Sequence, residues 1–229
     1  MQVSEQRFIN STKIKGNISR GIVVILFSII LLLVSSPYNA VMAENAYGLK
    51  VGEKAPDMTA DDVDGNTFDL YRSLESGPVV LVFYLGRWYP YSADQLSELQ
   101  DKIAKVADKY NAKIVAVSVD KRAEAKKIKR DESLSFTIIS DPDTKASTDF
   151  KVVQRLTDEV VERYLMVYEI DVEAASGKKH HMVAQPAVFV IDTTGTIVYT
   201  YSNKDYKVRA NVKEIRRALM KAASMQKHN

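Results

Sequence analysis

Apolar positions along the chain follow two patterns, unbroken runs and helical spacing, and together these patterns predict alternating strands and helices. Residues 79–84 and 113–119 are apolar at nearly every position, which is typical of strands that are covered on both faces. Between them, Leu96, Leu99 and Ile103 recur at three- and four-residue spacing among charged side chains, as on a helix that packs one face on a sheet. This alternation indicates a parallel or mixed sheet in an α/β domain, with residues 79–84 in its middle.

Shorter signals predict the remaining elements. Asp64-Gly65 lies between two short runs, and this dipeptide predicts an N-terminal β-hairpin over residues 58–70. A second hairpin is expected over residues 187–201. Residues 171–181 are polar and are predicted to form a surface loop. The other predicted elements are helices at 121–132, 143–150, 155–167 and 215–222, and a strand at 136–140.

The first 43 residues have the pattern of an export signal. Four basic residues precede an apolar run at 21–34, and a cleavage site of small residues follows at 41–43. The run is shorter than the roughly 18 residues expected of a spanning helix. We therefore expect a signal peptide at 1–43, with an uncleaved membrane anchor at 21–34 as the alternative. Residues 44–229 are then a single domain, exported to the periplasm or secreted.

Charge and composition exclude several classes of function. Residues 1–43 hold four of the chain's 32 basic residues and one of its 29 acidic residues, so 28 of each remain in the domain. This balance gives no sign of a nucleic-acid partner. The chain has no cysteine, which excludes a disulfide framework and a cysteine-based metal site. No dinucleotide or phosphate-binding motif occurs, and no cofactor is expected.

Several segments resemble the AhpC/TSA family of peroxiredoxin-like proteins, which have the thioredoxin fold. Residues 51–57, VGEKAPD, are similar to the family's opening motif, and residues 185–192, QPAVFVID, are similar to its closing motif. Three further similar segments are FYLGRWYPYS at 83–92, VAVSVD at 115–120 and SDPD at 140–143. The resemblance covers nearly all of residues 50–222. It implies a thioredoxin-like α/β fold, with a central mixed sheet flanked by helices and an N-terminal β-hairpin.

The segment from Trp88 to Ser92 is similar to the WCPYC motif of many family members, with both cysteines replaced. The resemblance places Tyr89 where the reactive cysteine would be and Ser92 where its partner would be. Neither a phenol nor an alcohol can form the sulfenic acid or the disulfide on which thiol peroxidase turnover depends. We therefore expect a redox-inactive site, in which Tyr89 fills the former peroxide pocket.

Ser92 has two possible roles, because it lies where a strand gives way to a helical pattern. As a helix cap, its hydroxyl would accept backbone N–H bonds, and this is the preferred interpretation. As a nucleophile it would need a base, and the chain's only histidines are His180, His181 and His228. No nucleophile-elbow motif surrounds Ser92. We therefore assign no catalytic residue.

A weak candidate metal site contains His180, His181 and Met182. Imidazole and thioether suit copper, and copper chaperones of this fold place a histidine near the active-site loop. Their site also needs a pair of cysteines, which this chain lacks. A solvated turn, with Lys178 and Lys179 beside the histidines, is the preferred interpretation.

The resemblance also implies a binding groove beside Pro186. In thioredoxin-fold proteins the proline at this point is typically cis and abuts the active-site motif. A cis X-Pro bond costs only about 0.5–1 kcal/mol more than a trans bond. The backbone next to such a proline can pair with an extended peptide. The predicted groove contains Arg87, Trp88, Tyr89, Pro90, Tyr91, Ser92, Gln185 and Pro186.

Three functions stay open at this point. The favoured one is an exported pseudoenzyme of the peroxiredoxin-like family that binds an unidentified protein or peptide partner. The second is an antioxidant oxidoreductase of thiol peroxidase type, with the redox work done by a partner or by non-thiol chemistry. The third is periplasmic copper or zinc binding through His180, His181 and Met182. Membrane contact is expected only through the N-terminal segment, if it is uncleaved.

Overall fold

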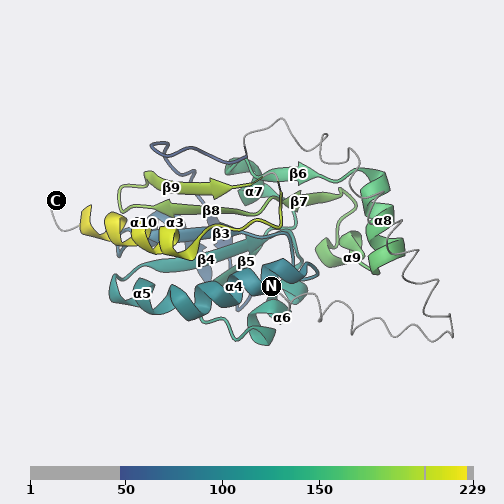
Figure 1. The fold of residues 1–229 in the computed structure, drawn as a ribbon, viewed down its shortest axis with the longest axis horizontal. Coiled ribbons are helices and arrows are strands. Elements are labelled where there is room, and N and C mark those ends of the chain that lie inside the picture. The colour runs from purple at the N-terminus through teal and green to yellow at the C-terminus, as the bar shows by residue number, and fades with distance from the viewer. Residues whose placement is uncertain (1–46, 204, 226–229) are drawn as a thin grey trace, which may run out of the picture. The chain divides into compact units, whose positions relative to one another are not determined.

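The computed structural model describes residues 47–203 and 205–225, and these form the domain considered below (Figure 1). The predicted signal peptide at 1–43 lies outside the described residues. Within the described ranges, every helix is too short or too polar to cross a bilayer.

A five-stranded mixed sheet lies at the centre of the domain, in the order β5-β4-β3-β8-β9. The middle strand, β3, is parallel to β4 and antiparallel to β8, with Val79 opposite Lys113 on one side and Ile191 on the other. The prediction that residues 79–84 form the middle of a mixed sheet is confirmed. The five strands are β3 (Val79–Phe83), β4 (Lys113–Ser118), β5 (Thr137–Ser140), β8 (Ala187–Ile191) and β9 (Ile197–Ser202).

Helices cover both faces of this sheet, which explains why β3 is apolar throughout. Val80 and Val82 point to the face covered by four helices, whose bounds are α4 (Pro90–Lys102), α5 (Ala104–Lys109), α6 (Arg122–Asp131) and α10 (Val212–Met225). Leu81 and Phe83 point to the opposite face, which is covered mainly by α3 (Leu70–Leu74), α7 (Lys145–Asp149) and the chain around them. Successive side chains of a strand point to opposite faces, so a strand between two helical layers is apolar at every position.

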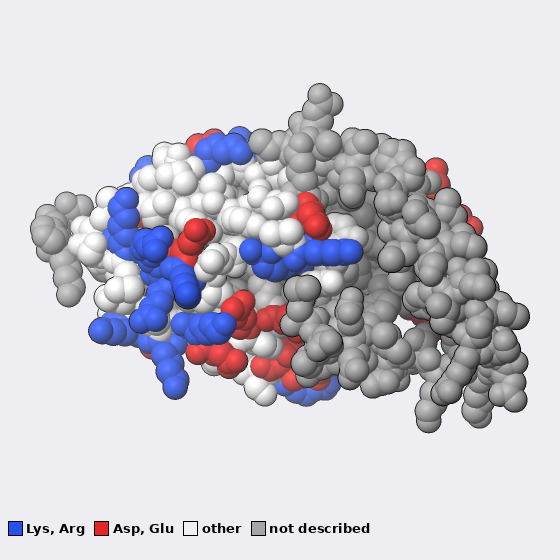
Figure 2. All heavy atoms as spheres, in the orientation of Figure 1, with Lys and Arg blue, Asp and Glu red and all other residues white. Residues whose placement is uncertain are grey.

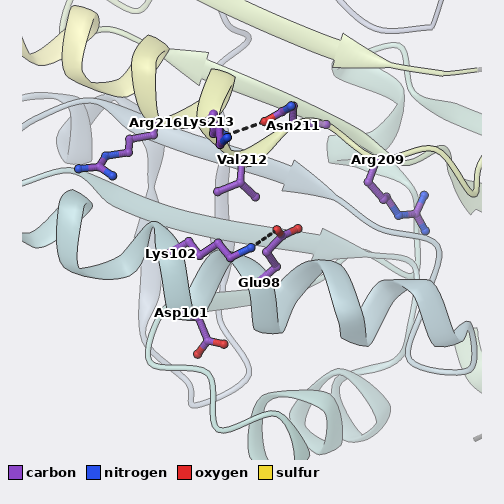
Figure 3. Close-up of a pocket in the computed structure, with 9 residues that line it drawn as sticks. Glu98, Asp101, Lys102, Arg209, Asn211, Val212, Lys213 and Arg216 are labelled. Carbon is purple, nitrogen blue, oxygen red and sulfur yellow. Dashed lines mark hydrogen bonds and ion pairs between the residues drawn. The ribbon is translucent and has the colours of Figure 1, made fainter. Parts of the chain in front are cut away.

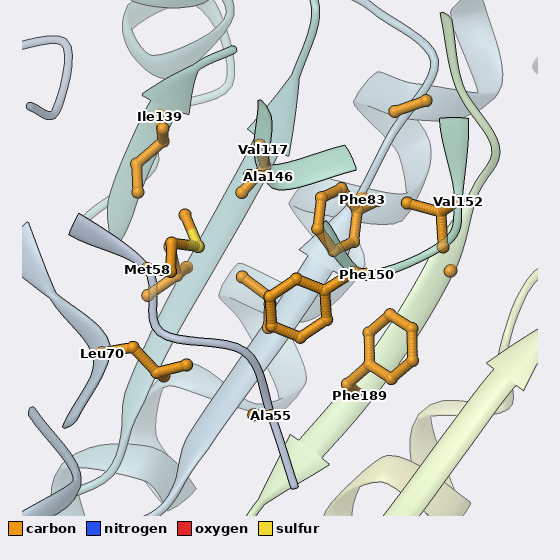
Figure 4. Close-up of a cluster of buried hydrophobic side chains, with 14 of the residues drawn as sticks. Ala55, Met58, Leu70, Phe83, Val117, Ile139, Ala146, Phe150, Val152 and Phe189 are labelled. Atoms are coloured by element: carbon orange, nitrogen blue, oxygen red, sulfur yellow. The ribbon is translucent and has the colours of Figure 1, made fainter. Parts of the chain in front are cut away.

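Three phenylalanines form the centre of the second face (Figure 4). The ring of Phe150 lies 5.4 Å from that of Phe83 and 5.3 Å from that of Phe189, measured between centroids. All three side chains are completely buried. The described residues thus form one hydrophobic cluster on each face of the sheet.

The predicted N-terminal hairpin is confirmed as β1 (Thr59–Asp61) and β2 (Thr67–Asp69), which pair antiparallel. A carboxylate oxygen of Asp62 holds its turn by accepting backbone N–H bonds from Asp64 at 2.9 Å and from Asn66 at 2.8 Å. Asp-Gly turns of this kind fix the register of the strands they join.

An insertion between β6 (Val153–Arg155) and β7 (Met182–Ala184) differs from the prediction. These two strands pair antiparallel and enclose α8 (Asp158–Tyr168) and α9 (Val172–Ser176). Residues 171–181 were expected to be a loop, but the first part is the helix α9. The carboxylate of Asp171 accepts the N–H of Ala174 at 2.8 Å, and Gly177 ends the helix in the left-handed region.

Candidate functional site

The candidate site begins at the loop between β3 and α4. Tyr89 is the N-cap residue of α4 and Pro90 is its first helical residue. Proline suits this position because its fixed φ matches a helix and no partner is needed for its missing N–H. The predicted capping role of Ser92 is wrong, since the helix begins two residues earlier. Ser92 is completely buried, and its hydroxyl has no hydrogen-bond partner in the described part of the chain.

The ring of Tyr89 lies inside a cluster of aromatic side chains. It stacks on Tyr91 and meets Tyr206 edge-on, both at 5.3 Å between centroids. Trp88 lies 5.9 Å from Tyr89 and 5.6 Å from Tyr164 of α8. Burial, with the neighbouring Tyr206, raises the pKa of the Tyr89 phenol far above its usual value, so the phenol stays protonated. The position that the resemblance assigns to the reactive cysteine is occupied by a packed, neutral ring.

Arg209 was not predicted from the sequence, and it lies against this cluster. Its guanidinium is 5.9 Å from the centroid of the Tyr89 ring, a distance that allows a cation–π interaction. One guanidinium nitrogen donates to the backbone carbonyl of Tyr206, whereas Nε and Nη2 are buried without a partner among the described residues. Burial lowers the pKa of Arg209. No periodic pattern or motif surrounds this residue, so the sequence offers no signal for it.

The side chain of Arg87 contacts α6. It forms ion pairs with Glu124 at 3.7 Å and with Asp131 at 3.2 Å. Its backbone N–H donates to a carboxylate oxygen of Asp120 at 2.6 Å, which fixes the loop to the chain that follows β4. At Gly86, φ is +149°, and an added Cβ would lie only 2.4 Å from the indole nitrogen of Trp88. Glycine is therefore required at this bend.

Asp120 is a second residue that sequence analysis did not assign to the site. Its side chain is completely buried, and burial raises its pKa to about 7. Oδ2 accepts the N–H of Arg87, but Oδ1 has no partner in the described ranges. The hydroxyl of Tyr84 is likewise buried and unpartnered there. A signal was present, because Asp120 lies two residues after a buried strand, which is an unusual place for a charge.

The other half of the predicted groove, Gln185 and Pro186, is buried. The backbone N–H of Gln185 donates to Val152 at 2.7 Å, and its side-chain amide donates to the carbonyl of Asn203 at 2.8 Å. The backbone at Gln185 is therefore already paired within the chain. The expected cis bond is wrong for this structure, where the Gln185–Pro186 bond is trans, the form that X-Pro bonds prefer by about 0.5–1 kcal/mol.

The two candidate metal-binding histidines contact protein groups with their ring nitrogens. His181 lies between two carboxylates, with Nδ1 3.1 Å from Asp158 and Nε2 2.7 Å from Glu173, and so connects α8 to α9. Nε2 of His180 lies 2.7 Å from the carbonyl oxygen of Pro142. Within the described residues, no three side chains of the histidine, aspartate or glutamate type are grouped to hold a metal ion.

A cavity of about 770 Å³ lies between α4 and the start of α10 (Figure 3). Glu98 and Lys102, which form an ion pair at 2.6 Å, lie on its α4 side. Arg209 lines it as well, but Figure 3 shows its guanidinium pointing away from the other labelled side chains. The rest of the lining is Asp101, Ala210, Asn211, Val212, Lys213 and Arg216.

The insertion helix α8 has an exposed apolar end, and none of its residues is buried. Four consecutive large apolar side chains are exposed, and we call them the α8 patch: Leu165 (49%), Met166 (75%), Val167 (64%) and Tyr168 (45%). The helix also carries Tyr164, which contacts Trp88, so the patch adjoins the aromatic cluster. The sequence shows this run of consecutive apolar residues, but its pattern predicts only a helix at 155–167 and does not predict that the side chains are exposed.

Comparisons with known proteins agree with this geometry. The model of the AhpC/TSA family matches residues 51–200. Peroxiredoxin Q, a chloroplastic protein of Oryza sativa subsp. japonica, is 26% identical over 153 residues, which cover 67% of this chain. The match spans 59% of the length of that relative.

Solved structures show the same fold. Peroxidoxin BcpB from Mycobacterium tuberculosis superposes with a TM-score of 0.59 and 22% identity, covering 77% of this chain and 98% of that one. The reduced 2-Cys peroxiredoxin of Plasmodium vivax has a TM-score of 0.58 and 19% identity, and the match covers 79% of this chain and 85% of that one. The thioredoxin-like fold and the family resemblance are thus confirmed, and no cysteine is present. The chain belongs to the AhpC/TSA family of peroxiredoxin-like proteins.

Proposed function

We propose that this chain is a redox-inactive member of its family that binds an apolar segment of a partner protein. The α8 patch is the observation that carries this proposal. Consecutive helical residues point about 100° apart, so these four side chains surround the end of the helix and do not form one flat face. Monomeric proteins rarely leave this much apolar side chain exposed in one place unless the surface binds something. The patch adjoins the position where the family has its reactive cysteine. The loss of that cysteine and the exposed apolar surface therefore occur in the same region of the domain.

The loss of thiol chemistry follows from the residues at the site. The reaction needs a thiolate, and the chain contains no cysteine. A tyrosine whose pKa is raised by burial is a poor nucleophile at neutral pH, and Ser92 is buried without a base recorded as its partner. Family membership alone supports the alternative antioxidant role, so that role needs a direct assay.

Charge around the α8 patch indicates the chemistry of the partner. The helix carries exposed acidic residues at Asp158, Glu159 and Glu162, and Glu169 follows it directly. Arg163 is the basic residue among them. A partner segment with an apolar centre and basic flanks would match both the apolar surface and the charge. The domain is further proposed to act after export, in the periplasm or outside the cell.

Trp88 provides a direct binding assay, because it is the only tryptophan of the chain and lies beside Tyr164. Peptides with an apolar centre and lysine flanks are titrated against residues 44–229 while tryptophan emission is recorded. We expect a saturable change, weakened at least about tenfold, or 1.4 kcal/mol, by Met166→Asp. Val51→Asp, at a similarly exposed apolar side chain (59%), is the matched control and should bind as the natural chain does. Equal binding by Met166→Asp would refute the proposed surface.

Peroxide consumption with a thiol reductant tests the inactivity of the site. The natural domain is compared with a Tyr89→Cys/Ser92→Cys variant, which restores thiols at the N-terminus of α4, where a thiol pKa is lowered. We expect the natural domain to match buffer, and turnover by the variant would show that only the thiols are missing. Consumption above buffer by the natural domain would support the antioxidant alternative instead.

A further inference from the structure

The C-terminal helix α10 presents a basic stripe to solvent. Lys213, Arg216, Arg217 and Lys221 follow one another at spacings that place them along one side of the helix, and all four are exposed. Glu214 is the single acidic residue of the helix. None of the four cations has an ion-pair partner among the described residues, in contrast to Lys102 on the neighbouring α4.

The positive charge continues from α10 onto α5. Lys105 and Lys109 of α5 are exposed as well, together with Asp108, the one acidic residue of that helix. Figure 2 shows Lys and Arg side chains gathered over α10 and α5 on one side of the view. The domain from residue 44 onward is formally neutral, with 28 basic and 28 acidic residues, so this end is positive because charges are segregated and not because of an overall excess.

An apolar side chain lies within the stripe. Met220 is 42% exposed, and it lies four residues after Arg216 and three after Arg217, on the same side of the helix. Ile215 and Leu219 point the other way and are buried against the sheet, so they hold the helix in place. A flexible apolar side chain among exposed cations suits a surface that is anionic outside and apolar beneath.

We propose that this face, made of α10 and α5, docks on a membrane surface that contains anionic phospholipid. Cations near such a surface add favourable attraction, and Met220 can enter the boundary between headgroups and acyl chains. Duplex nucleic acid and polyanionic peptides offer negative charge but no apolar layer for Met220. This face does not include α8, so the proposal is independent of the proposed partner site.

Vesicle co-sedimentation tests the proposal with residues 44–229. Vesicles of phosphatidylcholine alone are compared with vesicles of phosphatidylcholine mixed with phosphatidylglycerol. We expect binding to the mixed vesicles only, weakened by salt, and reduced by about tenfold or more in a Lys213→Gln/Arg216→Gln/Arg217→Gln variant. Met220→Ser should weaken binding without changing its salt dependence, because it alters the apolar contact and no charge.

A matched variant separates this face from overall charge. Lys126→Gln/Lys145→Gln/Lys151→Gln removes three exposed cations from other parts of the surface and should bind like the natural domain. Circular dichroism checks that both triple variants are folded. Equal loss in the two triple variants would overturn the proposal, as would equal binding to neutral vesicles. Binding to duplex DNA or polyglutamate, but not to mixed vesicles, would assign the face to a different anion and would also overturn it.

Discussion

We expect Asp120→Asn to make the stability of the domain much less dependent on pH. The Asp120 side chain is completely buried, and burial raises its pKa from 3.8 to about 7. Between these values the folded chain holds a proton that the unfolded chain has released. The free energy of unfolding of the natural domain therefore falls as the pH rises from about 4 through about 7. Asparagine has no proton to lose and lacks this dependence.

The two pKa values set the size of the effect. A tenfold change in proton affinity corresponds to about 1.4 kcal/mol, so protonation of Asp120 contributes roughly 4 kcal/mol to the free energy of unfolding at low pH. About 3 kcal/mol of this contribution is lost between pH 5 and pH 8. Burial makes the charged form costly and Glu124 adds a like charge, while the backbone N–H of Arg87 and the side chain of Ser118 compensate only in part. A loss of this size is a large fraction of the 5–15 kcal/mol by which domains are typically stable.

Urea unfolding, monitored by far-ultraviolet circular dichroism, gives the free energy of unfolding at about pH 5 and about pH 8, and the two values are compared. Asp141 is also buried with a raised pKa and contributes with the same sign, but it is present in both proteins and cancels in the comparison. Asp143→Asn, at an exposed carboxylate, is the control and should follow the natural domain. If the natural domain and Asp120→Asn lose the same stability between the two pH values, the assignment of a buried, protonated carboxyl is wrong.

Substitutions at three further positions test packing. Tyr89→Ala should lower the free energy of unfolding by about 2–3 kcal/mol, because the ring contacts of the cluster are lost. Tyr89→Phe keeps the ring and should change the free energy of unfolding by less than about 1 kcal/mol. Equal effects of the two substitutions in urea unfolding would contradict this expectation. Phe150→Ala should cost about 3–5 kcal/mol by the same measurement, and a cost below about 1 kcal/mol would show that the core is not tightly packed there. His181→Ala should speed hydrogen exchange in α8 but not in β3, and unchanged exchange in α8 would show that this contact does not hold the helix.

The central sheet was predictable because burial on both faces leaves an unmistakable pattern. Residues 79–84 are apolar at nearly every position, which a strand with one face in solvent would not be. The short strands β6 and β7 were missed, since three residues are too few to show a period. The helix α9 was missed although Asp171 and Gly177 are ordinary start and stop residues, because its five residues carry little apolar spacing.

The candidate site was only partly predictable, because its chemistry depends on tertiary packing. Tyr89 and Ser92 were found through the motif around them, whereas the cap assignment failed because Pro90 begins the helix earlier. Arg209 comes from a segment without periodicity and meets Tyr89 only in the folded chain. Burial of Gln185 and Asp120 follows from how loops pack on strand ends, which local sequence does not determine.

The antiparallel pairing of β6 with β7 gives the exposed part of residues 156–181 room to vary in evolution. Val153 pairs with Ala184 and Arg155 with Met182, so the chain leaves and re-enters the domain at neighbouring points. Lengthening a loop whose ends are already held together costs little entropy, and the five-stranded sheet contains neither strand. Selection can therefore change the exposed side chains of α8 while the five-stranded sheet stays the same, whereas Leu156 and Val172 of this segment belong to the core and are constrained by it.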